Sequence, residues 1–70
     1  MKQTYYVSTV RQAVTGDNEV HVETCQKLPL SQNRIRLGEY YHCAEAVNAA
    51  RKLYPTADGC KICSPACNRQ

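Results

Sequence analysis

Residues 59–65 of the chain read GCKICSP, and this stretch decides the fold that we expect. Two residues stand between Cys60 and Cys63, a spacing that lets two thiolates bind one metal ion while backbone amides donate hydrogen bonds to the sulfurs. Only seven residues follow Cys63, and Pro65 is among them, so the helix that a thioredoxin-like redox motif needs is not expected here. The stretch predicts a metal-binding knuckle near the end of the chain.

Two further ligands for such a knuckle occur earlier, at His21 and Cys25. In a continuous strand they would lie about 13 Å apart, at about 3.3 Å per residue, so the chain must bend between them. The polar run ETCQK at 23–27 can provide that bend. Tetrahedral zinc accepts this mixture of sulfur and nitrogen ligands. We therefore predict one structural Zn²⁺ per chain, bound by His21, Cys25, Cys60 and Cys63.

Other interpretations of these residues stay open. His21 lies on the polar face of its strand and could be solvated, and the cysteines could be inert, buried side chains. Cys67 follows Cys63 by four residues and could replace His21 in an all-cysteine site. In a zinc-free chain, Cys60 or Cys63 could instead form a disulfide with Cys25 or Cys67.

The fifth cysteine, Cys43, begins an expected helix. Its position three and four residues before Ala46 and Val47 predicts a buried thiol on the inward face. The alternative is a reactive thiolate stabilised by the helix N-terminus. His42 occupies the expected N-cap position and is not predicted to be a ligand.

Length and composition indicate why such a chain needs its cysteines. Seventy residues, expected to form a single small domain over 1–70, bury only about 60% of the surface that the unfolded chain exposes. The sequence contains no Phe or Trp, five Tyr and five Cys. A small core of this kind usually requires a metal or disulfides for stability.

Residue patterns predict an α+β fold. The segment 4–10, which is rich in Tyr, Val and Thr, and the alternation EVHVE at 19–23 suit two antiparallel strands, with Val20 and Val22 facing the core. A short third strand is expected from 35 towards Tyr40. The Ala-rich segment 43–54 predicts a helix that ends before Pro55, and 56–59 is expected to be a turn. We therefore expect a two- or three-stranded antiparallel sheet, one helix and a C-terminal Cys-rich knuckle.

Charge and segment composition limit the classes of function. There is no apolar run long enough for a secretory signal or a membrane span, so we expect a cytoplasmic protein with free thiols and no membrane partner. The net charge of +3 allows only a mild attraction to polyanions. No catalytic constellation is recognisable, and an enzyme is not expected.

The knuckle and its surroundings resemble a known family. The pattern His21-x3-Cys25, then an Ala-rich helix, then the GCKICSP stretch resembles the metal-binding domain of the Ada family of DNA-methylphosphate repair proteins. It is also similar to small bacterial proteins of unknown function that share the Gly-Cys-x-x-Cys-x-Pro ending. In the Ada family, four cysteines bind zinc and the first accepts a methyl group. His21 falls at that first position here, and an imidazole cannot replace a zinc-activated thiolate, so the repair activity is not implied.

Three functions are consistent with these observations. The first is a non-enzymatic zinc-stabilised binding or interaction module whose partner, a protein or a nucleic acid, is unknown. The second is a nucleic-acid-binding module with basic contacts and tyrosines that stack on bases; its residues would be Arg34, Arg36, Arg51, Lys52 and Lys61, with Tyr5, Tyr6, Tyr40 and Tyr41. The third is a thiol-redox or alkyl-acceptor protein that uses Cys43 or Cys67.

Overall fold

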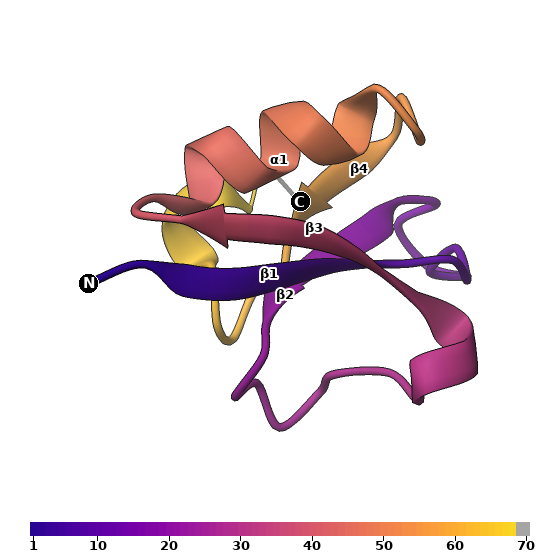
Figure 1. Cartoon of the computed structure of the whole chain (residues 1–70). Coiled ribbons are helices and arrows are strands. Elements are labelled where there is room, and N and C mark those ends of the chain that lie inside the picture. The colour runs from indigo at the N-terminus through magenta and orange to yellow at the C-terminus, as the bar shows by residue number, and fades with distance from the viewer. Residues whose placement is uncertain (69–70) are drawn as a thin grey trace.

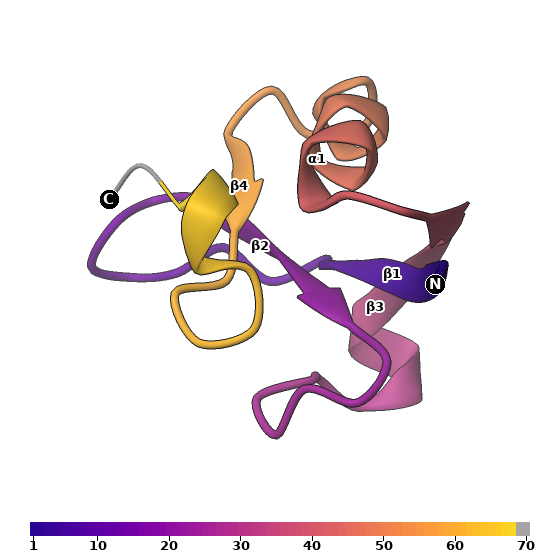
Figure 2. The ribbon, with the colours of Figure 1, turned by 90° about the vertical axis from the view of Figure 1, so that its left-hand side faces the viewer.

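The computed structural model describes residues 1–68, which form a four-stranded mixed sheet, one α-helix and two short 3-10 helices. The elements, in chain order, are β1 (Gln3–Ser8), β2 (Asn18–Val22), η1 (Ser31–Asn33), β3 (Arg34–Tyr40), α1 (Cys43–Arg51), β4 (Ala57–Gly59) and η2 (Pro65–Cys67). Figures 1 and 2 show α1 on one side of the sheet and the β2–β3 connection on the other. The predicted α+β class is confirmed.

The sheet has more strands than the sequence predicts. Its order is β3-β1-β2-β4, with β1 antiparallel to both of its neighbours. The expected turn at 56–59 is wrong from Ala57 onward, because Ala57–Gly59 pairs in parallel with Asn18–Val20 as β4. Three residues carry little local strand signal, and this pairing depends on the return of the chain after α1. As a result, the segment that contains Cys60 starts beside β2.

The core lies between α1 and the sheet (Figures 1 and 2). Val20 and Val22 of β2 are buried, as the alternation predicts, and so are Tyr5 and Val7 of β1. The inward face of α1 contributes three small or branched side chains: Ala46, Val47 and Ala50. Such a small set of apolar side chains gives marginal stability alone, so links outside this core matter for the fold.

Helix α1 begins where the sequence predicts and ends earlier. His42 is the N-cap residue, and its backbone amide donates a hydrogen bond to the Glu45 carboxylate at 3.1 Å, as in a capping box. The helix ends at Arg51 rather than at Tyr54. Leu53, which lies inside the predicted helix range 43–54, is 53% exposed, because the chain turns after Arg51 to reach Pro55 and β4.

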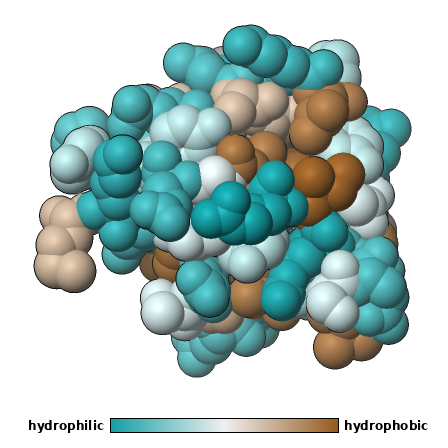
Figure 3. Space-filling model, in the orientation of Figure 1, coloured by the Kyte–Doolittle hydropathy of each residue, from teal (hydrophilic) through white to brown (hydrophobic). Residues whose placement is uncertain are grey.

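Apolar side chains also remain at the surface. The large ones among the described residues are Met1, Val10, Val14, Leu30, Ile35, Tyr41, Leu53 and Ile62. On the face seen in Figure 3, apolar groups lie between hydrophilic ones. Within residues 1–68, no helix has the length and apolar character needed to cross a membrane.

Candidate metal centre

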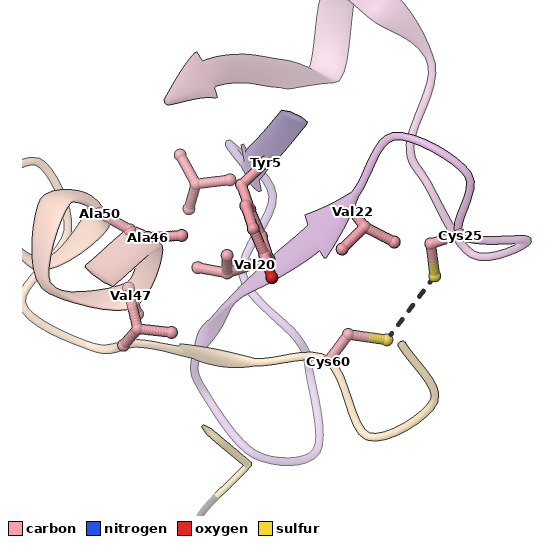
Figure 4. Packing of buried hydrophobic residues seen from close by; sticks show 10 residues of the cluster. Tyr5, Val20, Val22, Cys25, Ala46, Val47, Ala50 and Cys60 are labelled. Carbon is pink, nitrogen blue, oxygen red and sulfur yellow. Dashed lines mark hydrogen bonds between the residues drawn. The ribbon is translucent and has the colours of Figure 1, made fainter. Parts of the chain in front are cut away.

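Four side chains converge beside the core: His21, Cys25, Cys60 and Cys63. One ligand atom from each lies within 4.8 Å of the ligand atoms of the other three. The Sγ atoms of Cys25 and Cys60 are 3.9 Å apart, and Figure 4 shows these two side chains pointing toward one another. The Cys63 Sγ lies 3.9 Å from the His21 Nδ1. Tetrahedral zinc with bonds of about 2.3 Å to sulfur places two sulfurs about 3.8 Å apart, so this four-donor cluster has the dimensions of a metal site.

The bend required between His21 and Cys25 is present. His21 lies near the end of β2, and the chain turns at residues 23–24. The Cys25 amide donates a hydrogen bond to the Val22 carbonyl at 3.0 Å, which closes this turn. Cys25 therefore folds back towards the sheet instead of continuing along the strand.

The knuckle is attached to β2 directly. The Cys60 amide donates to the Val20 carbonyl at 2.9 Å, and the Ser64 amide donates to the Cys60 carbonyl at the same distance. The first bond extends the pairing of β4 with β2 by one residue. The second closes the turn that carries Cys63 back towards His21.

Each sulfur of the cluster accepts a backbone N–H. The amide of Lys27 donates to Cys25, that of Ile62 to Cys60, and that of Val22 to Cys63, each at 3.4 Å. The first two bonds have the same spacing, from residue i+2 to the sulfur of residue i. Such donors stabilise negative charge on sulfur. The backbone thus directs an N–H donor at each of the three sulfurs, an arrangement that inert buried cysteines would not require.

Burial affects the protonation of the metal-free cluster. His21 is 2% exposed, and this burial lowers its pKa, with a smaller opposing effect from Glu19. Burial raises the pKa of Cys63 to about 12, and the amide of Val22 partly offsets the rise. Without metal, the imidazole is neutral and the Cys63 thiol keeps its proton near neutral pH. Metal binding at this thiol therefore releases a proton.

The interpretation of His21 as a solvated surface residue is wrong. Its side chain is on the sheet face that alternation assigns to it, opposite Val20 and Val22, but it is 2% exposed. The segment after β4 lies against this position, since the Cys63 Sγ contacts both His21 and the Val22 amide. A non-local segment covers a face that the local pattern presents as polar.

Cys43 and Cys67 form a disulfide outside the cluster. The prediction of Cys43 as a buried free thiol is therefore wrong. Cys25, Cys60 and Cys63 are free cysteines in this structure, which contains none of the alternative disulfides among its described residues. The 3-10 helix η2 places Cys67 beside the first turn of α1, with the two Cα atoms 6.2 Å apart. With Cys67 paired in this way, the donor set contains His21. The argument for a cytoplasmic location from free thiols fails for these two residues.

The predicted tyrosine and arginine surface is only partly available. Tyr5 is buried in the core, and the Tyr6 ring lies 4.7 Å beneath the Arg34 guanidinium. Arg51 donates a hydrogen bond to the Ala57 carbonyl at 3.1 Å. Tyr41 is exposed and lies 5.5 Å from the Lys2 ammonium. The structure does not bring the four tyrosines together as one stacking platform.

Sequence analysis did not identify Glu19 as part of this site. Its carboxylate Oε1 lies 3.6 Å from the His21 Nε2. The signal was present, because residues two apart on a strand share a face.

Comparison of the chain with family models, curated proteins and solved structures gives no match. The evidence on function therefore comes from the fold and the four-donor cluster.

Proposed function

We propose that the chain is a non-enzymatic binding or interaction module stabilised by one Zn²⁺ ion. The observation that carries this proposal is the convergence of His21, Cys25, Cys60 and Cys63 within 4.8 Å, with a backbone N–H directed at each sulfur. Three sulfurs and one imidazole nitrogen form a donor set typical of structural zinc.

The donor number supports a structural rather than a catalytic role. Catalytic zinc sites commonly have three protein ligands and keep one position for water or substrate. Here four protein donors lie within 4.8 Å of one another, the number that a closed structural site needs, and His21 and Cys60 are each 2% exposed. Zinc bound in this way links β2 and its following turn to the knuckle after β4.

The resemblance to the Ada-type metal-binding domain is consistent with this architecture and implies no alkyl transfer. Histidine stands at the position of the methyl-accepting cysteine. Alkyl acceptance or redox chemistry at Cys43 or Cys67 would first require reduction of the disulfide that joins them. Nucleic-acid binding stays an alternative role for the module, and a retention on DNA that falls steeply with salt would support it.

Elemental analysis of purified protein tests the proposal. We expect about one zinc per chain by mass spectrometry under native conditions, and loss of folding when a strong chelator removes the metal, since metal binding contributes to the folding free energy. Circular dichroism and amide NMR spectra would report the loss. A chain that remains folded and contains no zinc, even after incubation with Zn²⁺, would overturn the proposal.

A further inference from the structure

We propose that Glu19 is a positioning residue of the metal centre, which holds the His21 ring so that Nδ1 faces the metal and Nε2 carries the proton. This inference rests on the proposed function, because it specifies which ring nitrogen serves the site. It follows from the two contacts that the ring makes on opposite sides.

The ring orientation is visible in the distances. On one side, His21 Nδ1 lies 3.9 Å from the Cys63 Sγ. On the other side, Nε2 lies 3.6 Å from the Glu19 Oε1. Nδ1 is therefore the ring nitrogen that faces the Cys63 sulfur. The opposite nitrogen faces a carboxylate, which accepts hydrogen bonds and cannot donate when ionised.

The position of Glu19 is set by the strand. Glu19 and His21 are two apart in β2, so their side chains leave the same face. Glu19 also lines a surface hollow together with Lys27, Cys60 and Lys61. Within residues 1–68, no Lys or Arg nitrogen lies within the 4.0 Å salt-bridge distance of its carboxylate. Its partner in the described structure is the imidazole.

A carboxylate in this place has a known chemical effect. A metal-bound histidine commonly donates its second ring N–H to a carboxylate, which fixes the tautomer and ring orientation and makes the bound nitrogen more basic. Loss of such a partner typically weakens metal binding about 10- to 100-fold. Zn²⁺ at Nδ1 of His21 would leave Nε2–H to donate to Glu19.

Long-range ¹H–¹⁵N correlation spectra of the zinc-loaded full chain test the orientation directly. We expect the chemical shifts of His21 to show Nδ1 bound to metal and Nε2 protonated. Zinc bound through Nε2 would overturn this inference and leave the proposed function intact. Failure of the chain to bind zinc would overturn both.

Substitutions test the contribution of the carboxylate. We expect Glu19→Ala to weaken zinc binding about 10- to 100-fold in competition with a chromophoric chelator. Glu19→Gln retains an oxygen acceptor and should recover part of that loss. Glu23→Ala removes the same charge from an exposed residue just beyond β2 and serves as the matched control, with unchanged affinity. Equal affinities for Glu19→Ala and Glu23→Ala would contradict the role of Glu19.

Discussion

Two chemically different links hold the C-terminal segment, residues 60–67. The four-donor cluster joins it to β2 and the turn after β2, whereas the Cys43–Cys67 disulfide joins it to the first turn of α1. His21 and Cys60 in the cluster are each 2% exposed, while Cys43 and Cys67 are half-buried. Under the proposed function, the first link depends on a metal ion, whereas the second depends on an oxidant.

The comparison shows how a segment with little apolar surface can be ordered. Lys61, Ile62, Pro65 and Ala66 are exposed, so hydrophobic burial contributes little to holding this segment. The disulfide and, under the proposed function, metal ligation by sulfur replace that contribution, as is common in small domains. The two links attach different positions of the segment to different elements, and each can be removed without changing a residue of the other.

The largest effect is expected from His21→Ala. Loss of a ligand should abolish stable zinc binding and cost more than about 4 kcal/mol of unfolding free energy, the range seen when a metal site is lost. Denaturant unfolding and zinc analysis measure both quantities. His21→Cys restores four donors and should bind zinc. Full zinc content in His21→Ala would show that this residue is not a ligand.

Removal of the disulfide should have a smaller effect and leave the metal in place. For a sequence separation of 24 residues, the chain-entropy relation gives a loss of about 3 kcal/mol for Cys43→Ala combined with Cys67→Ala. The double variant avoids an unpaired thiol. Zinc content should stay at about one per chain. Loss of zinc in the double variant, with zinc retained in His21→Ala, would show that metal binding depends on Cys43 and Cys67 and not on His21.

Gly59→Ala tests the packing between β4 and residues 64–67. A Cβ at Gly59 would lie 2.7 Å from the Cys67 Cβ and 2.7 Å from the Ser64 carbonyl oxygen, and the backbone atom cannot move aside cheaply. We expect a loss of about 1 to 3 kcal/mol, as for other overpacked sites, measured by urea unfolding. Unchanged stability would indicate that residues 64–67 are not packed against β4.

The smallest expected effect is a dependence of folding stability on pH. It should distinguish the cluster from the disulfide, because disulfide-bonded cysteines do not titrate. In the metal-free chain, His21 has a lowered pKa, so the unfolded state binds more protons and stability falls as pH drops below about 6.5. Cys63 has a raised pKa, so the folded state keeps its proton longer and stability falls as pH rises above about 9.

Urea midpoints at several pH values measure this dependence. Zinc loading should remove the alkaline loss, because the metal-bound sulfur has already released its proton. Metal-free Cys63→Ala serves as a control and should also show a smaller alkaline loss. An identical alkaline loss in the zinc-loaded chain would argue against ligation by Cys63.

Much of the fold follows from local patterns. Alternation along β2 identifies Val20 and Val22 as core residues, because strand side chains alternate between faces, and the Tyr-, Val- and Thr-rich composition of residues 4–10 indicates β1. The start of α1 is readable from Glu45 and the Ala-rich run. Strand β4 was not predicted, because three residues form a strand here only by pairing with β2, far away in sequence.

The candidate site was likewise predictable from the sequence only in part. The residues of the four-donor cluster are recognisable from their types and spacings, because metal chemistry restricts both. The burial of His21, its contact with Glu19 through Nε2 and the pairing of Cys43 with Cys67 depended on tertiary structure. The burial of His21 and the Cys43–Cys67 disulfide each require segments distant in the chain to come together, and local sequence spacing contains no information about that. The shared face of Glu19 and His21 was readable from their spacing, but the ring nitrogen that Glu19 contacts was not.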